Sequence, residues 1–308
     1  MKLLSIPLVL LLGTGCGLFG GKDDDSTFVP PTEPPFDCDD LRNPDDWDFI
    51  ELENTAEEFA FDKEGFVVMA SDWSGAILRQ DRNGAVEVVA PFQSDELAGV
   101  DLFPNGDILF ADEENGALYK MTTSGVESLL AGGLTSPNSV VVHPGGTVFA
   151  TDFDEILEIR PGQGDIDIVV PHGDYDLDGL ALSMDYEHLW FNEDELGNVY
   201  RVRVDGSEPP ELMAELSTGQ GIELDGMAID ACDNVYALRT DGRVYRIRPD
   251  GSVETFVTVE RPGDMWTSAL HFGSGVGGWD SRYLYIMDRY GGLFEVFVGV
   301  PGVPEPHL

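Results

Sequence analysis

Short apolar runs alternate with polar turns along most of the chain. In the clearest stretch, apolar residues occupy every second position at Met227 and Ile229 and again at Val235 and Ala237, which is the period of a strand with one buried face. The Asp-Asn pair between these runs favours a tight turn, and a third apolar run follows Gly242. The pattern therefore predicts short antiparallel strands joined by turns.

The same unit recurs six times along the chain. Its copies begin 40 to 47 residues apart, at Glu57, Ala98, Asn138, Asp178, Asp225 and Thr267. Each copy contains three apolar strands, and most end with a fourth, such as the runs that begin at Val86 and Val253. A period of about 40 residues with four strands per repeat is typical of a β-propeller. We therefore predict an all-β fold, a six-bladed β-propeller with four antiparallel strands per blade.

The ring is predicted to close through the N-terminus. The sixth copy lacks a clear fourth strand because a Pro-rich segment follows it from Val300, whereas an extra strand at residues 47–52 precedes the first copy. If this N-terminal strand completes blade six, the ring has no exposed sheet edge. We expect the propeller to span residues 47–299, with a Pro-rich tail at 300–308.

The first residues have the features of an export signal. Residues 1–16 contain one lysine, an apolar run too short to span a membrane, and small residues before Cys16. The segment resembles a bacterial lipoprotein signal, which implies lipidation of Cys16, although Gly13 stands where such signals usually have Leu; ordinary cleavage would leave Cys16 free. Residues 17–46 are rich in Gly, Asp and Pro and are expected to form a disordered tether. The prediction is an exported, lipid-anchored domain on the periplasmic or cell-surface side of a bacterial membrane.

The charge of the chain limits its partners. The 58 acidic residues and 17 basic residues give a formal net charge of −41. Binding to nucleic acid or to anionic lipid needs a basic surface, so neither is an expected partner. The simplest interpretation is an acidic, well-solvated surface. A salty habitat and a cation-seeking surface are the alternatives.

One mouth of the central channel carries the candidate chemistry. The innermost strands of a propeller begin beside the axis, so their first residues meet there. Three of these are the acids Glu57, Asp178 and Asp225, and Asn138 adds an amide. Converging carboxylates repel one another unless a cation lies among them. An all-oxygen donor set favours Ca²⁺ over Mg²⁺. The alternative is that Asp178 and Asp225, which both precede Gly, are ordinary turn residues, but this does not account for Glu57.

Other polar and aromatic residues are placed around the same face. Acids where the second strands end could add ligands, contact substrate or be solvated: Asp72, Asp112, Asp152, Glu193 and Asp288. His143 and His271 are expected to be packed or turn histidines. Trp73 and Trp266 lie near loops of this face and could line a pocket.

These motifs resemble the SMP-30/gluconolactonase family, also called regucalcin-like. The similarity is carried by the runs that begin at Ser136, Asp178, Asp225 and Thr267, and it covers about residues 50–299. It implies a six-bladed propeller and, for many members, a metal-dependent lactonase or esterase. By resemblance, Glu57, Asp178 and Asp225 hold the catalytic divalent ion and Asn138 contacts the substrate.

Blade four departs from the family pattern, since Asp178 replaces the usual Asn. This change should tighten cation binding and lower the Lewis acidity of the ion. The implied reaction has the ion polarise a lactone or ester carbonyl while Asp225 takes a proton from water and Asn138 donates to the developing oxyanion. The ligand candidates are therefore Glu57, Asn138, Asp178 and Asp225, and the partner is a small lactone or ester bound by a monomer. The alternative is a non-catalytic propeller with a structural calcium that binds a ligand or protein.

The two remaining cysteines are predicted to pair. Export favours oxidation of Cys38 and Cys232. The N-terminal strand must run toward the candidate site, so Cys38 starts on the opposite face, and the turn that carries Cys232 lies on that face too. A Cys38–Cys232 disulfide is expected; two free thiols are the alternative.

Overall fold

The structure is a computed structural model that describes residues 37, 38, 41 and 43–308, apart from 72, 73, 93, 95, 164, 165, 174, 175, 195 and 217–221. The predicted signal at 1–16, its Cys16 and most of the predicted tether lie outside the described residues, as do Asp72 and Trp73. Within the described residues there is no helix of the length and apolarity needed to cross a membrane.

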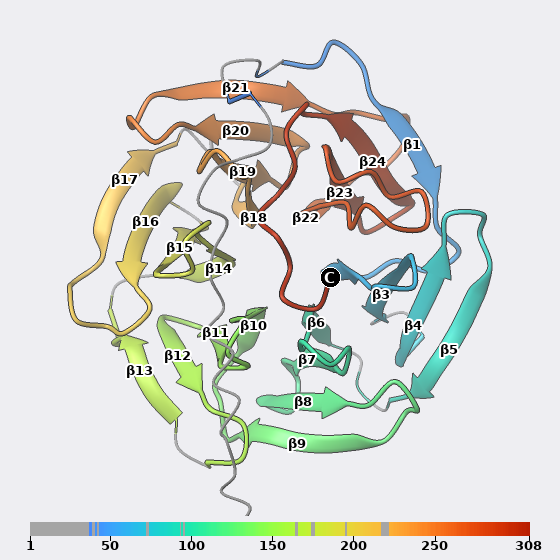
Figure 1. Ribbon diagram of the computed structural model, residues 1–308, viewed down its shortest axis with the longest axis vertical. Coiled ribbons are helices and arrows are strands. Elements are labelled where there is room, and N and C mark those ends of the chain that lie inside the picture. The colour runs from blue at the N-terminus through green and yellow to red at the C-terminus, as the bar shows by residue number, and fades with distance from the viewer. Residues whose placement is uncertain are drawn as a thin grey trace, which may run out of the picture.

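Six four-stranded antiparallel sheets form a ring (Figure 1), which confirms the six-bladed β-propeller. From the axis outward, the strands of blades one to three are β2 (Phe59–Phe61), β3 (Phe66–Ser71), β4 (Ala76–Asp81), β5 (Val86–Pro91); β6 (Leu97–Leu102), β7 (Ile108–Asp112), β8 (Ala117–Met121), β9 (Glu127–Gly132); and β10 (Pro137–Val142), β11 (Val148–Asp152), β12 (Glu155–Ile159), β13 (Ile166–Val170). Those of blades four and five are β14 (Leu177–Leu182), β15 (His188–Glu193), β16 (Asn198–Arg203), β17 (Glu211–Glu215); and β18 (Leu224–Ile229), β19 (Val235–Arg239), β20 (Arg243–Ile247), β21 (Val253–Thr258).

Blade six combines both ends of the described chain. It contains β22 (Thr267–Phe272), β23 (Tyr283–Asp288) and β24 (Gly292–Phe297), and its outer strand is β1 (Asp48–Glu51). The strands β1 and β24 are antiparallel, with Asp48 opposite Glu295 and Glu51 opposite Gly292. The predicted closure by the N-terminal strand is therefore confirmed.

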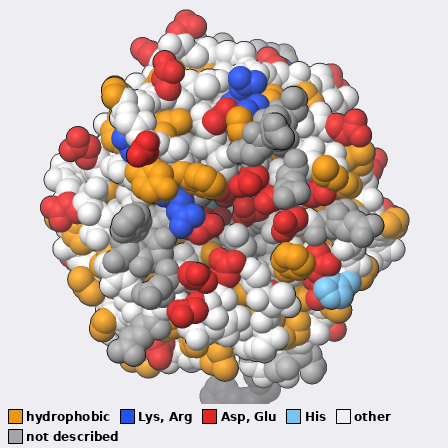
Figure 2. All heavy atoms as spheres, turned by 180° about the vertical axis from the view of Figure 1, so that it is seen from behind, with side chains coloured by type: hydrophobic (Ala, Val, Ile, Leu, Met, Phe, Trp, Pro, Cys, Tyr) orange, Lys and Arg blue, Asp and Glu red, His pale blue; other side chains and the backbone are white. Residues whose placement is uncertain are grey.

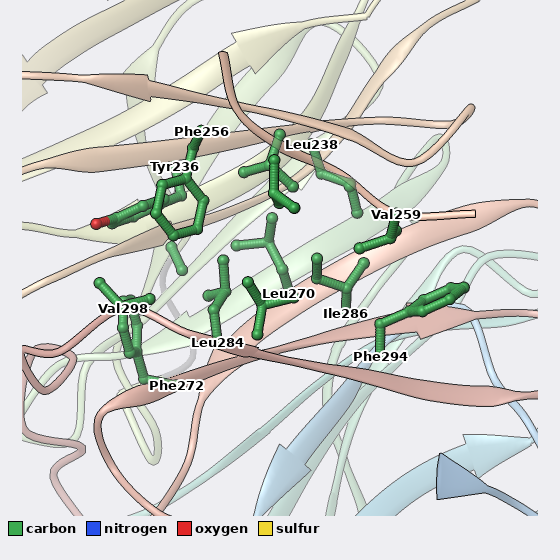
Figure 3. Packing of buried hydrophobic residues seen from close by; sticks show 14 of the residues in the cluster. Tyr236, Leu238, Phe256, Val259, Leu270, Phe272, Leu284, Ile286, Phe294 and Val298 are labelled. Atoms are coloured by element: carbon green, nitrogen blue, oxygen red, sulfur yellow. The ribbon is translucent and has the colours of Figure 1, made fainter. Parts of the chain in front are cut away.

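The hydrophobic core lies between neighbouring blades. Figure 3 shows one such layer, in which Leu270, Leu284 and Ile286 of blade six face Tyr236 and Leu238 of blade five. Because each blade buries one sheet face against the next, the ring fixes the positions of the inner strands. Burial of each of these side chains contributes about 1.5–3 kcal/mol relative to exposure.

The inner strands share a β-bulge near their beginning. In blade two Leu97 lies opposite Asp112 but Val100 lies opposite Phe110, so β6 has one extra residue there. Blades three to six show the same shift. A bulge turns the side chains of a strand locally. Here the bulged residues include Ala98 and its equivalents in the other blades, which are the candidate site positions.

The register corrects the repeat alignment in blade six. Thr267 lies opposite Asp288 as Leu97 lies opposite Asp112, so Ser268, and not Thr267, is equivalent to Ala98. The buried Thr267 hydroxyl instead donates to the carbonyl oxygen of Arg239 at 2.7 Å.

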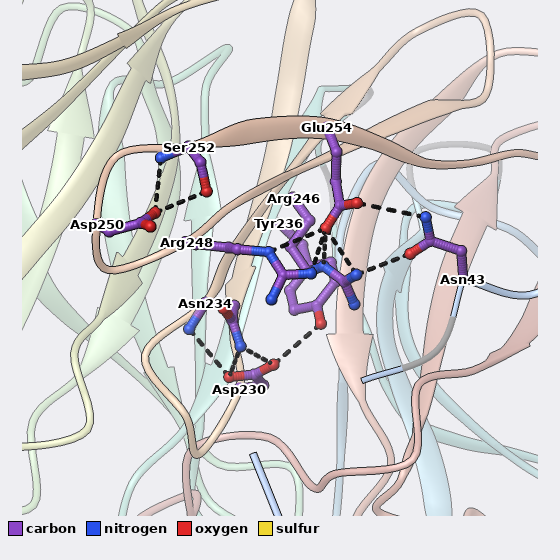
Figure 4. A network of polar contacts seen from close by, with 9 residues as sticks. All are labelled: Asn43, Asp230, Asn234, Tyr236, Arg246, Arg248, Asp250, Ser252 and Glu254. Carbon is purple, nitrogen blue, oxygen red and sulfur yellow. Dashed lines mark hydrogen bonds and ion pairs between the residues drawn. The ribbon is translucent and has the colours of Figure 1, made fainter. Parts of the chain in front are cut away.

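The described part of the predicted tether is attached to the propeller. Cys38 and Cys232 form a disulfide, the expected pairing. Leu41 and Trp47 pack against the core layer between blades five and six. Figure 4 shows the Asn43 amide between Arg246 and Glu254, with its oxygen 2.7 Å from Arg246 Nη2. Leu41, Asn43 and Trp47 thus attach this segment to blades five and six.

The Pro-rich segment after β24 crosses the face opposite the candidate site and ends at the axis (Figure 1). Val300 is buried, and Val303 donates its amide to the Ile229 carbonyl at 3.0 Å. Near the end, the His307 ring is buried and donates to the Phe61 carbonyl at 2.6 Å. Residues 300–308 are therefore part of the packed molecule and cover the channel at that end.

Candidate functional site

Acidic side chains from three blades meet at the open mouth of the channel. Glu57 precedes β2, while Asp178 and Asp225 occupy the bulges of β14 and β18. In blade one Phe61 lies opposite Val67 as Leu102 lies opposite Ile108, which makes Glu57 equivalent to Ala98. Figure 2 shows this face, with acidic side chains gathered around its centre.

The negative charges of these carboxylates act on one another. Burial raises the pKa of Asp225 well above its usual range, and the negative charges of Asp178 and Glu57 raise it further. Burial likewise raises the pKa of Asp178, and Glu57 and Asp194 add to the effect. Asp225 is only 7% exposed. Negative charge at the mouth therefore exceeds positive charge.

Arg289 supplies a positive charge beside this group. Its Nη1 lies 3.2 Å from Glu57 Oε2, and its charge lowers the otherwise raised pKa of Asp225. Repeat alignment did not point to Arg289, although it directly follows the last residue of β23, at the position equivalent to Glu113 and Asp194. One guanidinium cannot neutralise three carboxylates, of which Asp225 is buried and Glu57 and Asp178 are partly buried.

The backbone of each acid is fixed by a neighbouring blade. The Ser268 hydroxyl donates to the Glu57 carbonyl at 2.5 Å. The Thr151 hydroxyl donates to the Asp178 carbonyl at 3.2 Å, and the Asn192 amide donates to that of Asp225. These bonds orient the three residues before any ligand binds.

Small residues allow the inner strands to approach one another. A Cβ on Gly99 would lie 2.2 Å from the Asn138 carbonyl oxygen, and one on Gly179 would lie 2.3 Å from that of Asp225. Gly99 and Gly179 belong to the bulges of β6 and β14. Asn138 is held in the same ring of positions by β10.

A second carboxylate layer lies deeper in the channel. Glu58 occupies the position at which other blades have Gly, Ser or Ala, and its Oε1 accepts from the Ser139 hydroxyl at 3.1 Å. Burial raises the pKa of Glu58 to about 8. His271 Nε2 lies 4.0 Å from Glu58 Oε1, and burial lowers the pKa of this histidine to about 4. His271 is therefore a neutral, packed histidine, as expected. Glu58 was not predicted as a site residue, although the aligned repeats show a carboxylate there in a column of small residues.

The acids where the second strands end are not solvated. Asp112, Asp152, Glu193 and Asp288 are all buried. Asp152 accepts the amides of Thr135 and Ser136, and Asp288 accepts that of Trp266 at 3.1 Å. These side chains shape the loops around the mouth. The interpretation that these acids are solvated is therefore wrong for the four members that the structure describes.

Exposed aromatic side chains lie in loops of blades three and six on the same face. Phe153, Trp266 and Tyr290 are exposed by 48%, 39% and 53%, each in a loop next to a site-facing strand end. Phe153 has a φ of 58°, which is rare for a bulky residue and more frequent at functional sites. His143, by contrast, accepts the Gly145 amide in a turn.

The donor set fits a hard divalent cation. Three carboxylates and one amide at the mouth provide only oxygen ligands, and the buried negative charge is not compensated by Arg289. Oxygen sets of this kind suit Ca²⁺ in particular.

Residues 61–288 match the sequence profile of the family described as SMP-30/gluconolactonase/LRE-like region. None of the curated proteins searched matches the chain.

Several solved structures have the same fold. A gluconolactonase structure from Xanthomonas campestris shares 18% identity over 90% of this chain and 99% of its own, with a TM-score of 0.67. A calcium-binding protein, regucalcin from Agrobacterium tumefaciens, shares 19% identity over 83% of this chain and 94% of its own, with a TM-score of 0.66. Virginiamycin B lyase from Staphylococcus aureus shares 16% identity over 82% of this chain and 89% of its own, with a TM-score of 0.59. At these identities the structural likeness establishes the fold alone.

Proposed function

Because the chain belongs to the SMP-30/gluconolactonase/LRE-like family, we propose that it hydrolyses a lactone or an ester with the help of a divalent cation at the acidic mouth. The observation that carries this proposal is the meeting of Glu57, Asp178 and Asp225, in which the charge of Glu57 raises the pKa of Asp178 and of Asp225. Relatives named gluconolactonase and regucalcin, a calcium-binding protein, support the class of reaction and the cation.

In this proposal Glu57, Asp178, Asp225 and Asn138 hold the cation, with Ca²⁺ as the ion that an oxygen-only set favours. When bound, the cation would polarise the carbonyl group of the substrate and lower the pKa of a nearby water. Asp178, a carboxylate where the resemblance implies an amide, adds negative charge and favours tight binding of the ion.

Two side chains supply the remaining steps. Asp225 accepts the proton of the attacking water, for which it must be ionised, and a cation among the three acids favours that state. The Asn138 amide donates to the oxygen on which negative charge develops. Arg289, 3.2 Å from Glu57, keeps that carboxylate oriented.

The surroundings of the mouth favour a substrate with an apolar part. The exposed rings of Phe153, Trp266 and Tyr290 offer contact area for an acyl chain or an aryl group. We propose that the protein is exported and anchored through lipidated Cys16, so that it meets small-molecule substrates outside the cytoplasm as a monomer.

A hydrolysis screen tests the proposal. The full chain is stripped of metal with a chelator, and turnover of aliphatic lactones, a sugar lactone and aryl esters is measured with and without Ca²⁺. Calcium-dependent turnover should fall about 100-fold or more in Asp225→Asn, which removes the base. The matched control is Glu208→Gln, an exposed acid away from the mouth.

The alternative function has its own outcome in the same experiment. Asp178 favours tight cation binding over strong polarisation, which suits a propeller with a structural calcium. Absence of turnover, together with a calcium-dependent rise in melting temperature, would support such a binding protein. Turnover that survives Asp225→Asn would count against the proposed mechanism.

A further inference from the structure

A second group of potential ligands lies at the opposite, covered end of the channel. Asp101, Glu305 and His307 each offer one ligand atom, and the three atoms lie within 4.8 Å of one another. Asp101 comes from β6, whereas Glu305 and His307 belong to the C-terminal segment. Carboxylate from the ring and imidazole from the tail therefore meet inside the molecule.

The hydrogen bonding of His307 leaves one ring nitrogen able to bind a ligand. Its Nε2 must donate to the Phe61 carbonyl, because a carbonyl oxygen can only accept. The other ring nitrogen, Nδ1, is then an acceptor, and it is buried without a hydrogen-bond partner among the described residues. The residue is only 7% exposed. Metal-binding histidines commonly fix one ring nitrogen by such a bond and use the other as the ligand.

Asp101 is held in place for the same role. Its Oδ1 accepts the Leu102 amide and its Oδ2 accepts the Val142 amide, both at 2.6 Å. Each oxygen keeps one lone pair, so the carboxylate can still bind an ion. Asp101 and Glu305 line a cavity of about 60 Å³ beneath the tail, which is large enough to hold water.

We propose that Asp101, Glu305 and His307 form a second cation site, distinct from the acidic mouth, which binds a divalent transition metal of the Zn²⁺ type. One imidazole and two carboxylates are ligands that Zn²⁺ accepts, whereas the mouth offers oxygen alone. The site joins the tail to blade two, and the bond from His307 to Phe61 joins it to blade one. Its role is structural: the metal fastens the C-terminal segment across the channel and closes that end.

The test measures zinc and calcium binding by the full chain after removal of metal with a chelator. Zinc affinity, measured by competition with a chromophoric chelator, should fall at least about tenfold in His307→Gln and in Glu305→Gln, since loss of even an indirect metal partner costs 10- to 100-fold. Asp225→Asn should leave this zinc affinity unchanged but weaken calcium. His172→Gln, which alters an exposed histidine, is the matched control.

A second readout follows the tail itself. Bound Zn²⁺ should slow carboxypeptidase trimming from Leu308 at least about tenfold in the parent chain and have no effect in Glu305→Gln, which keeps the size of the side chain. Equal zinc affinity in the parent chain and in both tail variants, with normal circular dichroism, would overturn the proposal. So would a loss of zinc in His172→Gln that equals the loss in His307→Gln. The outcome does not depend on whether the mouth is catalytic.

Discussion

Gly179 lies so close to blade five that a Cβ at this position would stand 2.3 Å from the carbonyl oxygen of Asp225. The same glycine donates its amide to Asn192, whose side chain also binds the Asp225 carbonyl. The two candidate ligand positions of blades four and five are therefore held by one close backbone contact.

Gly179→Ala should damage the mouth. The added methyl group must displace backbone, which costs about 1–3 kcal/mol in stability and moves Asp178 and Asp225 apart. Calcium titration calorimetry and thermal unfolding measure both effects. Gly132→Ala is the control, because a Cβ there meets only side-chain atoms at 3.6 Å. Equal calcium affinity in the two variants would contradict the expected role of this contact.

Arg289→Gln should strengthen calcium binding severalfold. The guanidinium 3.2 Å from Glu57 competes with a cation for the same carboxylates, and a solvent-accessible ion pair of this kind contributes up to about 1 kcal/mol. The calcium-free protein should become less stable, because the remaining acids repel without a counter-charge. Calorimetry at two salt concentrations checks this result. Weaker calcium binding in the variant would mean that Arg289 orders the site more than it opposes the ion.

The metal-free protein should lose stability as pH rises from about 4.5 to about 8. Burial raises the pKa of Glu58 from 4.5 to about 8, that of Asp101 to about 7 and that of Glu305 to about 8. The folded state therefore holds protons that the unfolded state has released, so the stabilisation is complete below pH 4.5 and is lost as pH approaches 8. The loss should be on the order of a few kcal/mol in urea unfolding.

Divalent metal should reverse this pH dependence. A cation binds the ionised carboxylates of the folded state and stabilises it by mass action, more strongly at pH 8 than at pH 5. Glu58→Gln, which removes one raised carboxyl group, should flatten the metal-free profile. A flat profile in the parent chain would show that these groups are not buried as described.

Cys232→Ser should destabilise the chain by about 2–4 kcal/mol, because the disulfide to Cys38 closes a span of 194 residues. The loss should act on the N-terminal segment, which the disulfide, Leu41 and Asn43 hold against blade five. Thermal unfolding with and without reductant measures it. Reductant should have no effect on Cys232→Ser, and an unchanged melting temperature in that variant would contradict the prediction.

The sequence repeat was enough to predict the blades, the closure and the acids at the mouth, because each depends on a position in a regular period. The repeat alignment was wrong by one residue in blade six. No glycine marks the bulge there, and Thr267 and Ser268 are both small hydroxyl residues. Thr267 instead bonds to blade five, which no pattern within one repeat could reveal. Asp152 and Asp288 are buried for a similar reason, since their partners are backbone amides of loops.

The repeat pattern could not predict the group formed by Asp101, Glu305 and His307. Glu305 and His307 lie outside the repeats, and their proximity to Asp101 arises only when the last residues cross the ring. By contrast, Glu58 could have been found, because a carboxylate stands out in an aligned column of Gly, Ser and Ala.

The disulfide between Cys38 and the turn after β18 also gives the molecule a defined orientation. Cys38 is held on the side on which the C-terminal segment lies, whereas Asp178 and Asp225 lie at the other end of the channel. If the protein is anchored in a membrane through its N-terminus, as proposed, the acidic opening points outward to the surrounding medium, and a substrate reaches it without passing the lipid surface.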